Sequence, residues 1–115
     1  MLEGIFVLDK EFNDLISARV KYCLETLAFK AVEYATEDRL HNFRTSAVMQ
    51  DISMQQALCG MMAKHTVSIY DMCSEDRPLP LHMWHEKITD HINYLLLLEA
   101  IVTEGARGTN DQEDN

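Results

Sequence analysis

Apolar and polar positions along the chain repeat with the period of an α-helix over three long segments. No glycine or proline occurs between residues 10 and 36, where an apolar row contains Ile16, Val20, Cys23, Leu27, Ala31 and Ala35. Asp9 is a suitable N-cap for this helix, and residues 5–8 before it form either a short strand or an apolar staple. Similar rows from Met54 to Cys73 and from Leu81 to about Glu104 predict two further long helices.

Capping and helix-breaking residues separate these segments. Ser53 and Gln56 have the spacing of a capping box at the start of one long helix. The two prolines within residues 74–80 cannot continue that helix, and Gly105 is suited to the C-cap of the last one. A short helix is expected through residues 47–49. The prediction is an all-α bundle of three long helices and one short helix, with residues 1–104 as a single domain and residues 105–115 as a disordered acidic tail.

The last predicted helix has apolar positions on more than one side. One line of its surface contains Ile88, Ile92, Leu95 and Glu99, and a second line, roughly 160–200° away, contains Glu86, Asp90 and Asn93. Leu97 is the next position on the second line and is poorly suited to water. We therefore expect this helix to be covered on two sides, by its own chain and by a second copy, so the protein is expected to be a homo-oligomer.

The charge balance narrows the range of partners. A net charge of −9 disfavours direct binding to nucleic acid or to an anionic membrane, because both repel an acidic surface. The three cysteines are widely spaced, and the apolar run at residues 5–8 is too short for a signal peptide, so we expect reduced thiols in a cytoplasmic protein. An acidic protein that binds phosphates usually does so through Mg²⁺.

Two pairs of carboxylates are candidates for such a metal site. Glu33 and Glu37 are four residues apart, as are Glu86 and Asp90, so each pair shares one face of its helix. Four carboxylates on adjacent helices could hold Mg²⁺, although an acidic chain also has such pairs on solvated faces by chance. Lys30 and Lys64 could contact phosphates or could pair with surface acids. A zinc site at His82 and Glu86 is a weaker alternative, because the chain has no His-Glu-x-x-His order.

Four short motifs resemble a group of small phage and prophage proteins. They are Glu33-Tyr34, His41-Asn42-Phe43, Met61-Met62-Ala63-Lys64 and Asp90-His91-Ile92-Asn93-Tyr94. That group, some of whose members are labelled nucleotide-modification-associated, looks related to the all-α MazG-like and dUTPase-like nucleoside triphosphate pyrophosphohydrolases. The resemblance implies an oligomeric helical bundle in the cytoplasm, which is the host cytoplasm if a phage encodes the chain. It also implies a nucleotide site near Lys30, Tyr34, Asn42, Lys64, Asn93 and Tyr94.

Three functions are compatible with these features. The first is Mg²⁺-dependent cleavage between the α- and β-phosphates of a nucleotide, with metal held by Glu33, Glu37, Glu86 and Asp90. The related enzymes carry Glu-Glu-x-x-Glu and Glu-x-x-Asp, so this carboxylate set is thinner and differently spaced. The second is non-catalytic capture of a nucleotide or nucleotide-derived signal, which a phage could use against host defence. The third is a helical module that binds another protein.

Overall fold

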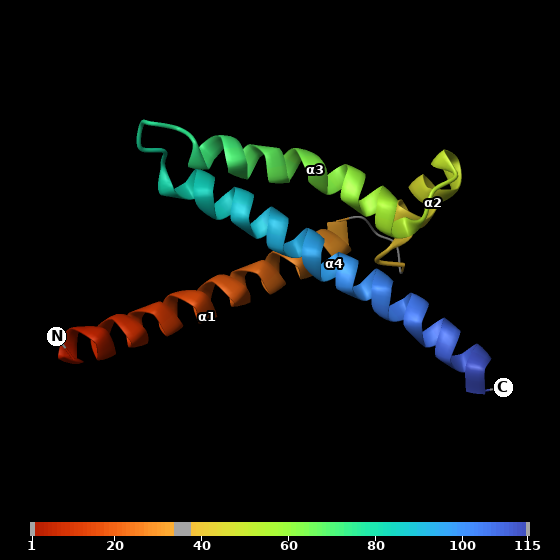
Figure 1. Cartoon of the computed structure of the whole chain (residues 1–115), viewed down its shortest axis with the longest axis horizontal. Helices are drawn as coiled ribbons and strands as arrows, with labels where there is room; N and C mark the ends of the chain where they lie inside the picture. The colour runs from red at the N-terminus through yellow and green to blue at the C-terminus, as the bar shows by residue number, and fades with distance from the viewer. Residues whose placement is uncertain (1, 34–37, 115) are drawn as a thin grey trace.

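The computed structural model describes residues 2–33 and 38–114, and side chains within residues 9–30 and 38–108. It contains the helices α1 (Leu2–Glu33), α2 (His41–Gln50), α3 (Met54–Cys73) and α4 (Leu81–Asp114), as Figure 1 shows. All the described secondary structure is helical, so the predicted all-α class with three long helices and one short helix is confirmed. None of the described helices is long and apolar enough to cross a membrane.

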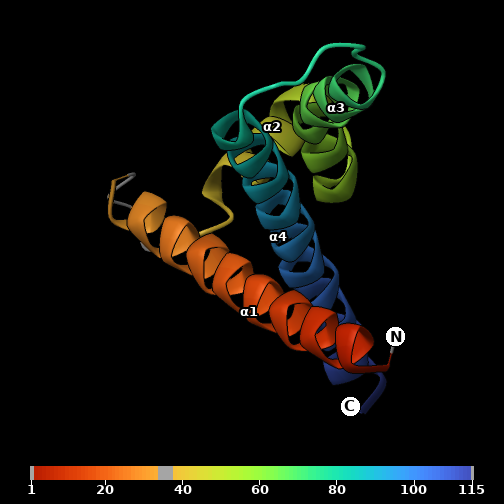
Figure 2. The same cartoon turned by 90° about the vertical axis from the view of Figure 1, so that its left-hand side faces the viewer.

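Helix α4 is the element on which the others are assembled. Helices α3 and α4 lie side by side and run in opposite directions, while α2 packs against the start of α3 (Figure 1). Helix α1 contacts α4 on another side and diverges from the first half of α4 toward the N-terminus in Figure 1, and Figure 2 shows the two helices crossing. The arrangement is therefore open on the side of α1.

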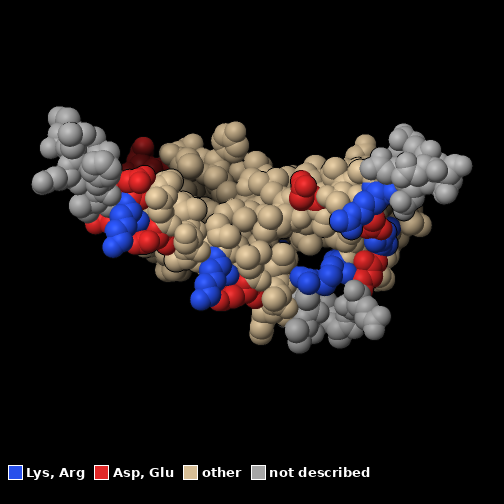
Figure 3. Space-filling view, turned by 90° about the horizontal axis from the view of Figure 1, so that it is seen from below, with Lys and Arg blue, Asp and Glu red and all other residues tan. Residues whose placement is uncertain are grey.

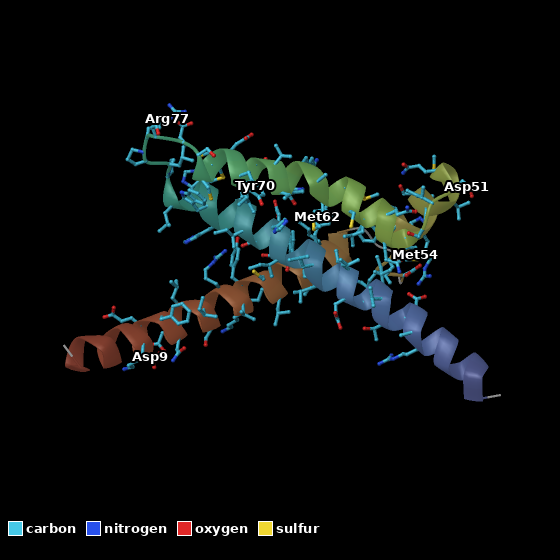
Figure 4. All side chains as sticks on the ribbon, viewed as in Figure 1. Asp9, Asp51, Met54, Met62, Tyr70 and Arg77 are labelled. Atoms are coloured by element: carbon cyan, nitrogen blue, oxygen red, sulfur yellow. The ribbon has the colours of Figure 1, made fainter. Side chains whose placement is uncertain are left out.

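The core is small and lies where α2, α3 and α4 meet. Its buried cluster consists of Leu40, Phe43, Leu58 and Ile101, against which Met54, Met61, Met62, Tyr94, Leu97 and Leu98 are packed. Met62 lies between α3 and α4 in Figure 4. Met54, Met61 and Met62 of α3 thus pack against the core cluster beside α4, which is a common use of this flexible side chain.

The connections around α3 follow from local chemistry. The Ser53 hydroxyl accepts a hydrogen bond from the Gln56 backbone at 3.1 Å, and the Gln56 side chain accepts one from the Ser53 backbone at 3.0 Å. This confirms the predicted capping box. Asp51, at the turn labelled in Figure 4, has a φ of 56° and ends α2 in the left-handed region, which Asn and Asp tolerate better than most residues.

Two predicted helix ends are wrong. Helix α1 begins at Leu2, so Asp9 lies inside it, and residues 5–8 form neither a strand nor a staple. Helix α4 continues to Asp114 through Gly105, which has no positive φ. A glycine inside a helix costs about 1 kcal/mol but does not end the helix without a change in φ. The predicted end of α1 near Thr36 lies outside the described residues, and the domain boundary at residue 104 stays a prediction.

The chain itself covers the two lines of α4 to different extents. The line of Asp90 and Asn93 is covered within the chain, since Asn93 is buried against α1 and Leu97 packs on the core cluster. On the other line Ile88 and Leu95 remain 38% and 47% exposed. Leu97 is therefore a core residue, and its apolar character is not evidence for contact with a second copy.

Candidate functional site

A cavity of about 220 Å³ lies where all four helices approach one another. Its wall takes residues from the C-terminal part of α1, the turn before α2, the start of α2 and the middle of α3 and α4. The structure brings together here five of the residues predicted for a site: Lys30, Asn42, Asp90, Asn93 and Tyr94. The cavity is therefore the place where segments that are distant in sequence converge.

Asn93 lines the cavity and also takes part in the contact between α1 and α4. Its side-chain amide donates a hydrogen bond to the Cys23 carbonyl at 3.1 Å, and both residues are buried. Its Oδ1 atom is also buried but finds no hydrogen-bond partner among the described residues. An unpartnered buried acceptor costs roughly 1–3 kcal/mol, so Asn93, a residue of the cavity wall, has an unused capacity to accept a hydrogen bond.

His65 supplies a second unused polar atom. Its Nδ1 lies 3.9 Å from an Asp90 carboxylate oxygen, which is too long for a hydrogen bond, and it has no other partner within the described residues. The imidazole ring lies against Tyr94, with 5.0 Å between centroids and a 41° tilt. Burial lowers the pKa of His65, and the nearby Asp90 carboxylate opposes this shift only in part. The imidazole is therefore neutral near pH 7, and Nδ1 can donate or accept according to its tautomer.

Cationic side chains lie at the edge of this cavity. Lys30 is exposed on α1, and Arg39 donates a hydrogen bond to the Leu27 carbonyl at 3.0 Å. Asp38 is engaged by Arg44 at 2.7 Å, which lowers the pKa of its carboxyl group. The charge of Asp38 is thus balanced locally, while Lys30 and Arg39 stand beside an apolar and aromatic interior.

A second hollow lies between α1 and the first turns of α4. Arg19 spans it by donating to the His85 carbonyl at 3.0 Å and to the Thr89 hydroxyl, with its guanidinium 5.0 Å from the Tyr22 ring centroid. Glu86 lines this hollow, and Lys30 and Asp90 line both. Neither of the two unpartnered buried polar atoms belongs to a residue of the second hollow, which makes the first cavity the better candidate for a binding site.

The remaining predicted site residues are placed in part. Tyr34, Glu37 and the side chain of Glu33 lie outside the described residues. Lys64 is exposed on α3 and lines neither cavity. Within the part of the chain that the structure describes, no group of three or more His, Cys, Asp or Glu side chains is arranged to hold a metal ion. The metal site thus stays a prediction that depends on Glu33 and Glu37.

His65 is the main cavity residue that is absent from the predicted site. A histidine on an apolar helix row is usually hydrogen-bonded within the core, but the Nδ1 of His65 has no such bond among the described residues. The sequence does show a polar residue, His65, on an apolar helix face. Only the packing of α4 against α3 in the structure shows that this face lines a cavity. In comparisons with known proteins, no family model, curated protein or solved structure matches the chain.

Proposed function

We propose that this chain binds a nucleotide or nucleotide-derived small molecule in the cavity between its four helices. The observation that carries the proposal is the pair of buried, unpartnered polar atoms, Asn93 Oδ1 and His65 Nδ1, on residues of one cavity wall. Most buried polar atoms in proteins are hydrogen-bonded, and each exception calls for an explanation, such as a catalytic role or a bound water or ion. Both atoms are buried, so a ligand with N–H or O–H donors would give them partners once the Asn93 amide and the His65 ring turn toward the cavity.

The volume of the cavity limits which part of a nucleotide can enter it. About 220 Å³ is below the roughly 300–1,000 Å³ of sites that enclose a drug-sized ligand. We therefore assign the interior to one planar ring system, such as a nucleobase. Tyr94 and Phe43 supply aromatic surface for it, and Asn93 supplies the amide group that can read its polar edge.

The phosphates would remain at the edge, near Lys30 and Arg39. Two cations, Lys30 and Arg39, and two carboxylates, Asp38 and Asp90, line this cavity, and Arg44 pairs with Asp38, so the cavity is less acidic than the chain with its ten Lys and Arg against 19 Asp and Glu. Arg39 already uses part of its guanidinium on the Leu27 carbonyl, which fixes its position. A guanidinium held in place loses less conformational entropy when it binds a phosphate.

A thermal-shift screen tests the proposal. Purified protein is heated with nucleoside mono-, di- and triphosphates and with cyclic nucleotides, each in Mg²⁺ and in EDTA. We expect at least one nucleotide to raise the melting temperature in EDTA. Lys30→Gln should reduce that shift, whereas Lys21→Gln, an exposed lysine of the same helix that lines neither cavity, should not. A flat screen in both conditions contradicts the proposal.

Hydrolysis of the bound nucleotide is the second candidate, and the position of Asp90 favours it. Asp90 and Lys30 line both hollows and Glu86 lines the second, so a metal held by the carboxylates of Asp90 and Glu86 would stand beside a phosphate at Lys30. This activity predicts that stabilisation requires Mg²⁺ and that monophosphate and pyrophosphate appear. Asp90→Asn should then abolish the Mg²⁺-dependent part of the shift. If the ligand is recovered intact after incubation with Mg²⁺, hydrolysis is contradicted and only the binding proposal stands.

A further inference from the structure

Three polar side chains line the cavity between the four helices and are largely withdrawn from solvent. They are His65 of α3, which is 14% exposed, Asp90 of α4, which is 24% exposed, and the buried Asn93. Asp90, Asn93 and Tyr94 are spaced by three and four residues, so they share one face of α4. The other charged, amide and imidazole side chains that line the cavity are exposed. The interior chemistry of the cavity therefore depends on these three residues.

Hydrogen-bond acceptors predominate among these three side chains. The Asn93 amide nitrogen already donates to the Cys23 carbonyl, which leaves the oxygen Oδ1 as the group without a partner. His65 Nδ1 also has no partner among the described residues, and a neutral imidazole has one nitrogen that accepts. The carboxylate of Asp90 has acceptor oxygens only. The interior is thus suited to a ligand that presents hydrogen-bond donors.

Asp90 differs from the carboxylates on the protein surface. Figure 3 shows groups of charged side chains in which acidic and basic residues are neighbours, and Asp38, for example, pairs with Arg44 at 2.7 Å. No described residue donates a hydrogen bond to the Asp90 carboxylate, whose nearest ion-pair partner is His65 Nδ1 at 3.9 Å. The carboxylate therefore lacks the donors that a ligand with two adjacent N–H groups would supply.

The nucleobases differ in the donors on their Watson–Crick edges. Guanine presents two neighbouring donors, the N1–H and the 2-amino group, which match the two oxygens of one carboxylate. Adenine and cytosine present an amino group beside a ring nitrogen that accepts, and uracil presents one N–H between two carbonyl groups. In these three bases an acceptor would face a carboxylate oxygen and repel it. A carboxylate on the cavity wall therefore favours guanine.

We propose that the cavity is specific for guanine nucleotides, with the Asp90 carboxylate accepting hydrogen bonds from N1–H and the 2-amino group of the base. This inference rests on the proposed function, which places a nucleobase in the same cavity. Tyr94 lies one helical turn from Asp90 on the same face of α4 and supplies aromatic surface for the ring. Lys30 lines the exposed edge of the cavity and remains available to the phosphates.

Isothermal titration calorimetry of the full chain tests the base specificity. The ligands are the monophosphates of guanosine, inosine, xanthosine, adenosine and uridine, all in EDTA so that no divalent metal contributes at Asp90. We expect guanosine monophosphate to bind most tightly. Inosine monophosphate lacks the 2-amino group and should bind at least about tenfold more weakly, because it loses one hydrogen bond to a charged acceptor. Xanthosine monophosphate, which has a carbonyl at that position, should also bind more weakly than guanosine monophosphate.

Asp90→Asn tests whether this side chain reads the base. An amide keeps one acceptor for N1–H but replaces the other oxygen with a donor, which suits the 2-carbonyl of xanthine. The variant should therefore bind xanthosine monophosphate more tightly than guanosine monophosphate, and this binding also shows that it is folded. Asp71→Asn removes the same charge from an exposed position of α3 that lines neither cavity, and it should keep the wild-type order of affinities.

The possible outcomes separate guanine specificity from nucleotide binding itself. If adenosine or uridine monophosphate binds the wild type as tightly as guanosine monophosphate, guanine specificity is overturned and the proposed function stands. An Asp90→Asn variant that does not prefer xanthosine to guanosine monophosphate overturns the role of Asp90. If no nucleotide of this set or of the thermal-shift screen binds the wild type, the proposed function fails as well.

Discussion

The side-chain amide of Asn93 in α4 donates a hydrogen bond to the backbone carbonyl of Cys23 in α1, across 70 residues of sequence, at 3.1 Å. Both residues are buried, and the hydrogen bond lies where the two helices cross. The same side chain forms part of the wall of the cavity. One amide group therefore positions α1 and belongs to a residue that lines the candidate site, with a buried oxygen that has no partner among the described residues.

Replacing Asn93 with Ala should destabilise the fold. The substitution removes the amide that reaches the Cys23 carbonyl, which keeps only its partner within the α1 helix, and the loss of this buried hydrogen bond costs about 0.5–1.5 kcal/mol. The free energy of unfolding in urea measures the loss. Asn42→Ala is the control, because Asn42 lines the same cavity but is exposed, and its effect should stay within about 0.5 kcal/mol. Equal stability of the two variants contradicts the role given to Asn93.

The small core makes each of its residues costly to truncate. Leu58 is fully buried in the cluster of α2, α3 and α4, so Leu58→Ala should lower the free energy of unfolding by about 2–5 kcal/mol. Val67→Ala removes methyl groups from a 58% exposed position of the same helix and should change it by less than about 0.5 kcal/mol. Chemical denaturation of both variants checks the comparison, and a small loss for Leu58→Ala would place the core elsewhere.

The stability of the protein should depend on the protonation of His65. Burial lowers the pKa of this imidazole below its usual 6.5, so the unfolded chain binds the proton more readily than the folded chain. The stability contributed by neutral His65 is present above pH 6.5 and is lost as the pH falls through the folded pKa. The melting temperature of the wild type should therefore fall between pH 7.5 and pH 5.5 by more than that of His65→Gln. Parallel curves contradict this assignment.

The charges around His65 allow a second test of its environment. The Asp90 carboxylate raises the pKa of His65, while Lys64, Lys87 and His91 lower it along with burial. Removing the opposing charge in Asp90→Asn should lower the pKa of His65 further. NMR titration of the His65 ring in both proteins measures the change. An unchanged or higher pKa in Asp90→Asn means that the two side chains do not interact as the 3.9 Å separation indicates.

The sequence was sufficient where local chemistry decides the structure. The capping box at Ser53 and the two prolines before Leu81 act within a few residues, and both ends of α3 and the start of α4 lie where they were predicted. The sequence was insufficient to predict the start of α1 and the end of α4. Asp9 and Gly105 suit helix termini, but each also fits inside a helix when the neighbouring residues continue it.

The cavity forms by packing between helices that are distant in sequence. The helical periodicity of apolar residues contains no information on that packing, so the cavity could not be predicted from it. Five of the ten predicted site residues line the cavity, but the sequence does not show that their segments meet at one cavity. The unpartnered state of His65 could not be inferred, because it requires knowing which side chains of α4 approach α3. The same limit applies to Leu97, whose helical position allowed either its own core or a second copy as its cover.

The most direct test of ligand binding in the cavity is a two-dimensional NMR titration of ¹⁵N-labelled protein with a panel of nucleotides in EDTA. The predicted result is a saturable shift of the Asn93 side-chain amide and of the His65 and Tyr94 backbone amides for at least one nucleotide. The Val67 amide, on the exposed face of α3, should not move. The contradicting result is a panel in which no nucleotide shifts Asn93, His65 or Tyr94, or in which the shifts of Val67 equal theirs.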